Sequence, residues 1–169
     1  MSLLPILQDP DPRLRKKAKP VTVFDAKLQT LIADMFETMY DAPGVGLAAT
    51  QVGVGLRLAV MDCAREEGVE ERLVLINPEI TELEDKQEME EGCLSVPEMK
   101  DKVSRFNKLT LKALDAEGKP YQLHAEGLLA QAIQHEIDHL DGKLYIDLLS
   151  PLKRERYKKK RDKALKNIA

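Results

Sequence analysis

The sequence predicts an α+β fold in which mostly antiparallel sheets pack around a central helix, with one N-terminal and one C-terminal helix. Three observations favour this class. Several strand-like segments follow one another in the middle of the chain, and helical periodicity lies on both sides of them. Successive strands with short connections pair antiparallel. At 169 residues and 43% hydrophobic content, one core can form without a disulfide framework.

The first predicted helix spans residues 25–41. Its apolar residues follow the i, i+3, i+4, i+7 spacing of one buried stripe, and they are Leu28, Leu31, Ile32, Met35, Phe36 and Met39. Pro43-Gly44 ends it, and a glycine-rich loop leads into a strand over 56–62. Leu56, Leu58 and Val60 share one face of that strand.

The remaining elements follow from the same patterns. Further strands are expected at 72–80, in a segment ending at Glu90, at 109–115 and at 120–126, the last two joined by a turn at 116–118. A late helix over 126–140 ends before Gly142, and Ser150-Pro151 opens the last helix. The last helix has few apolar residues, so we expect it to bury little and its removal to cost little activity.

Charge is unevenly distributed along the chain. Residues 153–169 hold nine basic and two acidic side chains, a charge of +7, whereas the first 152 residues carry −10. This contrast indicates an anionic partner for the tail, although a solvated helix end would look the same. With two cysteines, no run of 18 apolar residues and an apolar start too short for a signal peptide, we expect a cytoplasmic protein and no membrane partner.

The late helix carries His135-Glu136-Ile137-Asp138-His139, an H-E-x-x-H pattern. Four helical residues advance about 400°, so the two histidines lie about 40° apart on one face. Such a pair can bind one metal ion, with Glu136 beside it to reach a water on that metal. The pattern therefore predicts a metal-dependent hydrolase with a central metal-binding helix.

A third protein ligand is needed, and the sequence offers few candidates. The metzincin continuation matches through Gly142 but has Tyr145 where a histidine is required. A thermolysin-like glutamate would have to be Glu155, which lies in the basic tail. Cys93 remains, because a thiolate is a sound metal ligand and its neighbouring glycine allows close backbone approach. Cys63 is interpreted as a structural thiol.

The glycine-rich loop at 44–49 matches the dinucleotide fingerprint G-x-G-x-x-A only formally. That fingerprint works after a strand and before a helix, whereas here a helix precedes the loop and a strand follows it. We expect the loop instead to bring backbone close to a ligand, with Gln51 offering an amide N–H.

Three segments resemble the signature motifs of the peptide deformylase family in order and spacing: GVGLAATQ (44–51), EGCLS (91–95) and QHEIDH (134–139). The similarity extends from DPRLR near the start to LSPLKRER near the end, as in bacterial forms with a basic C-terminal helix. It implies a catalytic domain over 1–150, with 151–169 as a basic helix of the same domain. It further implies release of formate from formyl-methionyl nascent polypeptides in the bacterial cytoplasm.

The resemblance also implies roles for individual residues. The metal ligands would be Cys93, His135 and His139, and Glu136 would be the general acid/base as metal-bound water attacks the formyl carbon. Gln51 and the backbone N–H of Leu94 would hold the formyl oxygen. The methionine side chain and the peptide backbone would contact Val45, Gly46, Gly92, Leu128 and Ala132. Departures from the family pattern fall at Gln131, beside this pocket, and at 98–100 on its rim.

Cofactor and partners follow from the same resemblance. The family's physiological metal is Fe²⁺, one per chain, and Zn²⁺ or Ni²⁺ can occupy the site. Residues 153–169 would bind ribosomal RNA, and we expect a monomer.

Two other functions stay open on the residues alone. The first is a metal-dependent amidase or protease acting on another amide, which formate release would distinguish. The second is a non-catalytic metal-binding module docked on an RNA-rich particle, against which Glu136 argues, since a structural site has no use for it.

Overall fold

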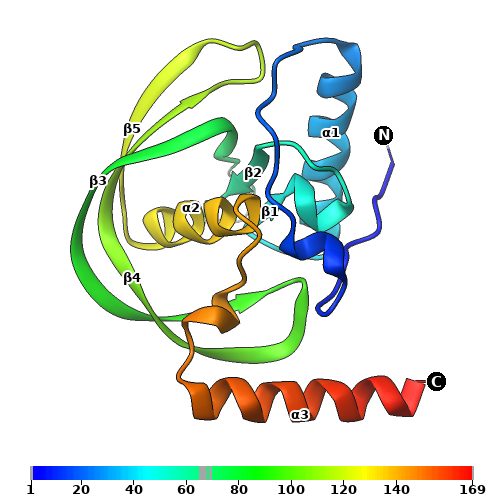
Figure 1. Cartoon of the computed structure of the whole chain (residues 1–169). Helices are drawn as coiled ribbons and strands as arrows, with labels where there is room; N and C mark the ends of the chain where they lie inside the picture. Colours follow the sequence, from blue (N-terminus) through cyan, green and yellow to red (C-terminus); the bar gives the residue numbers. More distant parts are fainter. Residues whose placement is uncertain (1, 65–67, 69, 169) are drawn as a thin grey trace.

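A computed structural model describes residues 2–64, 68 and 70–168 of the chain (Figure 1). One antiparallel sheet runs in the order β1-β2-β3-β4-β5. The strands are β1 (Gly46–Ala48), β2 (Leu58–Asp62), β3 (Arg72–Cys93), β4 (Val96–Leu114) and β5 (Pro120–Glu126). The helices are α1 (Ala26–Asp41), α2 (Gly127–Leu140) and α3 (Pro151–Ile168), with 3₁₀ turns η1 (Pro12–Arg15), η2 (Ala49–Val52) and η3 (Tyr145–Leu148). This architecture confirms the predicted α+β class.

Helix α2 lies at the centre of the molecule, inside the curve of β3, β4 and β5 (Figure 1). Ile133 and Leu140 are fully buried against the sheet. Gly142 ends the helix at φ +77°, and a Cβ there would collide with the backbone oxygen of Arg15. Glycine is needed at this position for both reasons. The predicted helix end is therefore confirmed.

Helix α1 begins where the sequence predicts. The Asp25 side chain accepts a hydrogen bond from the N–H of Leu28 at 3.0 Å, as expected of an N-cap. Five of the six predicted stripe residues are buried, and Leu31 is partly buried in the same cluster.

Strand β2 begins at Leu58 rather than at Leu56, and it is buried on both faces. Leu58 and Val60 pack in the cluster around α1, as predicted, whereas Ala59 and Met61 pack in the cluster around α2. A strand covered by helices on both sides has no polar face. An alternating apolar pattern therefore identifies the residues of only one of its two buried faces.

The hairpin formed by β3 and β4 is much longer than the sequence predicts. The two expected strands at 72–80 and ending at Glu90 are one continuous strand, and residues 96–108, which were not expected to be a strand, belong to β4. Residues 81–88 are exposed, so they show no apolar period. Within this stretch Glu84 faces the opposite charge of Lys108, and just beyond it Glu90 faces Lys102.

The last helix, α3, is mostly solvent-exposed, with one exception. Leu152 and Leu165 are 63% and 45% exposed, which agrees with the expectation that this helix buries little. Tyr157, however, is only 8% exposed and belongs to a cluster with Val96 and Tyr145. The first half of the helix is therefore docked on the domain. Among the described helices, none combines the length and hydrophobicity that a membrane-spanning segment requires.

Candidate active site

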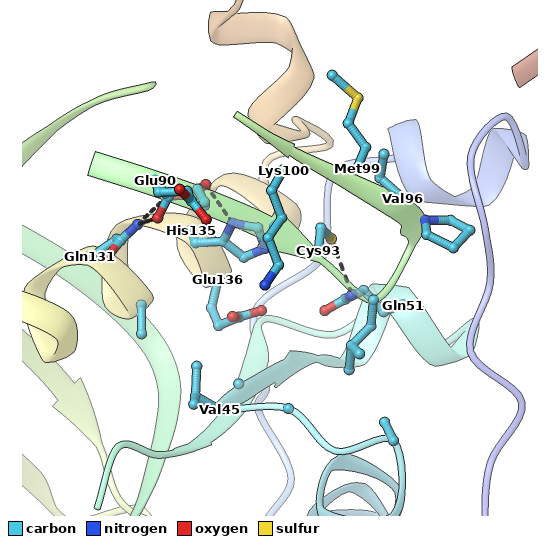
Figure 2. Close-up of a pocket in the computed structure, with 18 of the residues that line it drawn as sticks. Val45, Gln51, Glu90, Cys93, Val96, Met99, Lys100, Gln131, His135 and Glu136 are labelled. Carbon is cyan, nitrogen blue, oxygen red and sulfur yellow. Dashed lines mark hydrogen bonds and ion pairs between the residues drawn. The ribbon is translucent and has the colours of Figure 1, made fainter. Parts of the chain in front are cut away.

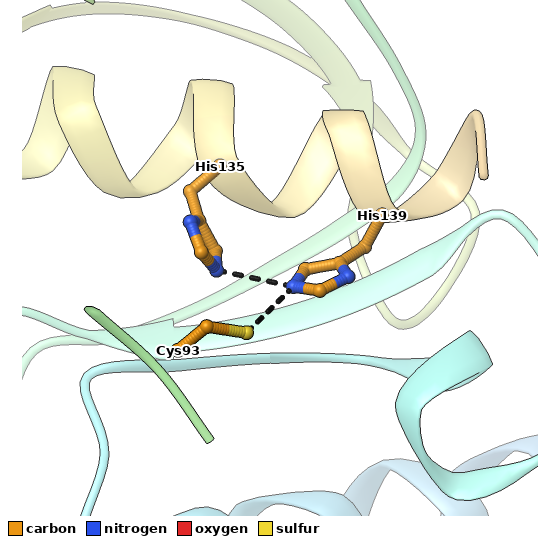
Figure 3. Close-up of side chains that lie close together, drawn as sticks. All are labelled: Cys93, His135 and His139. Carbon is orange, nitrogen blue, oxygen red and sulfur yellow. Dashed lines mark hydrogen bonds between the residues drawn. The ribbon is translucent and has the colours of Figure 1, made fainter. Parts of the chain in front are cut away.

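Helix α2 and the tip of the β3–β4 hairpin bring together three side chains of types that can bind a metal ion, Cys93, His135 and His139 (Figure 3). The Nε2 atoms of His135 and His139 are 3.0 Å apart, and Sγ of Cys93 is 3.3 Å from Nε2 of His139. All three donor atoms lie within 4.8 Å of one another. One thiolate and two imidazoles form a donor set that suits zinc or ferrous iron.

Glu91 fixes the orientation of His135. Its carboxylate is 2.7 Å from Nδ1 of His135, so Nε2 points to the cluster. Arg105 binds the same carboxylate through two hydrogen bonds, at 2.9 and 2.6 Å, and both side chains are about 95% buried. Burial alone would raise the pKa of Glu91, but the bonds from His135 and Arg105 outweigh it and hold the pKa at about 2. A charged, oriented carboxylate therefore supports the histidine.

Glu136 points into the pocket from α2 (Figure 2). It is 3% exposed, and its Oε1 has no hydrogen-bond partner in the described part of the chain. Burial raises its pKa to about 7. Gly46 faces it, and a Cβ at that position would collide with Oε2 of Glu136. An unpartnered buried carboxylate beside three metal donors can accept and return a proton.

Gln51 is held in a fixed orientation beside the cluster. Its Oε1 accepts a hydrogen bond from the N–H of Ala48 at 2.9 Å, and its Nε2 donates to Oγ of Ser95 at 3.0 Å. The second Nε2 hydrogen is directed toward Cys93, whose Sγ is 3.8 Å away (Figure 2). Both amide hydrogens therefore have acceptors, and the one directed to the thiol is the one that can be given to a ligand at the cluster.

Leu94 lies in the two-residue turn between β3 and β4, next to Cys93. Its backbone N–H is outside the ladder of the hairpin, and Leu94 lines the same cavity as Gln51.

These groups open into a cavity of about 1070 Å³. Of the eleven site residues predicted from the sequence, ten line it, namely Val45, Gly46, Gln51, Gly92, Cys93, Leu94, Leu128, Ala132, His135 and Glu136. The eleventh, His139, is 1% exposed and lies outside the lining. An apolar wall beside polar groups is typical of a ligand site.

Gln131 also lines the cavity, but its amide is directed to β3. Nε2 donates to the carbonyl of Glu90 at 2.8 Å and lies 3.3 Å from Oε1 of Glu91 (Figure 2). The amide is thus hydrogen-bonded to β3, which leaves the methylene groups of Gln131 for the apolar wall.

Sequence reasoning did not find every residue that supports the site. Glu91 lies inside the EGCLS segment, and its position two residues before Cys93 was the available signal. Ser95 is the last residue of the same segment. Arg105, which also binds Asp138 at 2.6 Å, carries no local pattern that indicates its role.

Comparison with known proteins gives a consistent result. The model of the polypeptide deformylase family matches residues 3–155. Peptide deformylase of Stutzerimonas stutzeri is 57% identical over 164 residues, covering 96% of both chains, and peptide deformylase 2 of Xanthomonas axonopodis is 54% identical with full coverage of both. A crystal structure of a Legionella pneumophila peptide deformylase superposes with a TM-score of 0.91, at 56% identity over 98% of this chain and 96% of that one. The Ehrlichia chaffeensis enzyme, in complex with actinonin, also gives 0.91, at 40% identity over 97% and 98%.

Proposed function

The chain belongs to the peptide deformylase family and is a metal-dependent hydrolase that removes the N-formyl group from nascent peptides, and we propose that the cavity at the β3–β4 tip is its active site. Cys93, His135 and His139 hold the metal in this proposal. The observation that carries it is the buried, unpartnered Oε1 of Glu136 beside three converging donor atoms. A site built only for structure would not leave a carboxylate unsatisfied there.

Cys93, His135 and His139 would hold a divalent cation, which would supply Lewis-acid polarisation and lower the pKa of a water molecule. Glu136 takes the proton of the attacking water and passes it to the departing amine. Gln51 and the N–H of Leu94 donate to the formyl oxygen as negative charge develops on it. Each such donor contributes about 3–4 kcal/mol to stabilising the transition state.

The substrate side of the proposal concerns the methionine that carries the formyl group. Val45, Leu128 and Ala132 form the apolar wall that takes its side chain, and the backbones of Gly46 and Gly92 contact the peptide. The position of all five in the lining supports this assignment. The hydrogen bond from the Gln131 amide to the Glu90 carbonyl supports it too, because this polar group already has a partner on β3.

We further propose Fe²⁺ as the resident metal, one per chain, with Zn²⁺ or Ni²⁺ able to replace it. Elemental analysis of anaerobically purified protein tests the ligand set directly. We expect one iron per chain in the parent and in Cys63→Ala, and loss of metal and of formate release in Cys93→Ala. Full metal content in Cys93→Ala, or formate release unchanged, would remove Cys93 from the ligand set.

The remaining proposals concern organisation and partners. Residues 1–150 form the catalytic domain, and 151–169 form a basic helix of the same domain. Its charge of +7 supports binding of this segment to ribosomal RNA, since lysine and arginine on phosphates release counterions. We propose a monomer in the bacterial cytoplasm.

A further inference from the structure

Residues 7–9 connect the two backbone segments that carry the proposed formyl-oxygen donors. The N–H of Leu7 donates to the carbonyl of Gln51 at 2.7 Å, and the N–H of Asp9 donates to the carbonyl of Ser95 at 2.8 Å. Ser95 directly follows Leu94 and binds the Gln51 side chain. The segment 7–9, called the strap below, therefore ties η2 to the β3–β4 turn at the two points where the donors lie.

The strap is in turn held by the C-terminal helix. Oδ2 of Asp9 accepts hydrogen bonds from the Tyr157 hydroxyl and from Nη1 of Arg161, each at 2.7 Å. Asp9 is only 9% exposed, and the Arg161 guanidinium lies 5.7 Å from the centre of the Tyr157 ring. Tyr157 and Arg161 are one helical turn apart, so both reach Asp9 from the same face of α3.

A second ion pair, between Lys153 and Asp101, joins α3 to β4, but it is more exposed to solvent. Lys153 lies 3.0 Å from Asp101, but the two side chains are 48% and 24% exposed. Solvent-exposed pairs contribute little. The Asp9 side chain is 5% exposed and that of Arg161 is 20% exposed, so this ion pair is shielded from water. Asp9 also accepts a hydrogen bond from the buried Tyr157 hydroxyl. Of these two ion pairs between α3 and the rest of the domain, the one at Asp9 is therefore the better shielded, and it is the one that reaches the strap.

We propose that Asp9 is a positioning residue for the formyl-oxygen donors, and that Tyr157 and Arg161 of α3 hold it in place. The inference rests on the proposed function, in which Gln51 and the N–H of Leu94 bind the formyl oxygen. Donors must be held within a few tenths of an ångström to stabilise developing charge. If the strap shifts, the Ser95 carbonyl loses its partner and the neighbouring N–H of Leu94 moves with it. The sequence-based expectation, that the tail matters little for activity on a short peptide, predicts the opposite result in the test below.

The test compares the full-length, metal-loaded variants Asp9→Ala and Arg161→Gln with a matched control, Asp11→Asn. Asp11 also lies in the N-terminal segment and pairs with an arginine, but its partner is Arg13 within the same turn. We expect kcat on a short formyl-methionyl peptide to fall about 10-fold in both Asp9→Ala and Arg161→Gln, with KM within about twofold. This lies below the loss of 10²–10³ seen when a donor is removed outright. Arg161→Lys should restore part of kcat, and Asp11→Asn should keep the parent value.

A second measurement does not depend on turnover. Amide hydrogen exchange of the full chain should speed up about 10-fold at the backbone N–H of residue 9 in both variants, relative to the intrinsic rate of each sequence, and stay unchanged in Asp11→Asn. Parent-like kcat in Asp9→Ala and Arg161→Gln would overturn the inference, as would a fall in kcat with unchanged exchange or with loss of metal. Arg161→Gln changes a partly exposed side chain, so it keeps the test valid if Asp9→Ala fails to fold.

A Gln51→Ala variant separates this inference from the proposed function. If kcat falls in Gln51→Ala but not in the Asp9 and Arg161 variants, only the positioning role is wrong. If kcat is unchanged in Gln51→Ala, the assignment of the formyl-oxygen donor is itself wrong.

Discussion

Glu91→Gln removes the buried negative charge that supports His135 while keeping the size of the side chain. At about 1.36 kcal/mol per pH unit, a pKa held at about 2 instead of the ordinary 4.5 corresponds to about 3 kcal/mol of unfolding free energy. Because the folded-state pKa is lowered, this contribution is present above pH 4.5 and is lost as the pH falls toward 2. Breaking a buried ion pair by removing the charge of one partner, as Glu91→Gln does to Arg105, lowers the free energy of unfolding by a similar amount, about 3–5 kcal/mol.

Urea unfolding of the metal-free parent and Glu91→Gln proteins, followed by circular dichroism, measures this difference. We expect the parent to be about 3 kcal/mol more stable at pH 7, and about half of that difference to be gone at pH 3. A difference that stays the same from pH 7 to pH 3 would refute the reasoning, because a neutral contact would then account for it. Metal affinity should also fall about 10- to 100-fold, as is usual when the support of a histidine ligand is lost.

Two further predictions concern other parts of the molecule. Gly46→Ala places a methyl group 3.0 Å from Cδ of Glu136, so the carboxylate must move. We expect formate release to fall by about 10²-fold at unchanged metal content. A parent-like rate would show that Glu136 functions equally well in the shifted position. Lys158, Lys159 and Lys160 are all exposed. Replacing the three with glutamine should weaken ribosome binding at low salt and reduce its salt dependence. Identical binding curves for the parent and the variant would show that these lysines do not contact the ribosome.

Much of the site could be predicted because its chemistry is local in sequence. The H-E-x-x-H pattern needs only helical geometry to place His135 and His139 together. Cys93 was the remaining third-ligand candidate, and the family motifs supported that choice. The α1 stripe and the Gly142 helix end are likewise visible in the sequence because each depends on neighbours a few residues away.

The parts that could not be predicted depend on contacts between distant segments. Residues 81–88 of β3 are exposed on both faces of the strand, so no apolar period marks them as strand. Arg105 joins Glu91 and Asp138 across the hairpin and α2, and Asp9 joins Tyr157 across 148 residues. A charged or polar side chain looks the same in sequence whether it faces water or a buried partner.

The role of Glu136 is the central claim, and Glu136→Gln tests it most directly. Metal content and formate release should be measured on the same anaerobically purified sample, with His135→Ala as the variant that loses a ligand. In Glu136→Gln we expect full metal content and a rate of formate release lower by at least about 10²-fold. Only His135→Ala should lose metal. Loss of metal from Glu136→Gln, or formate release at the parent rate, would contradict this claim.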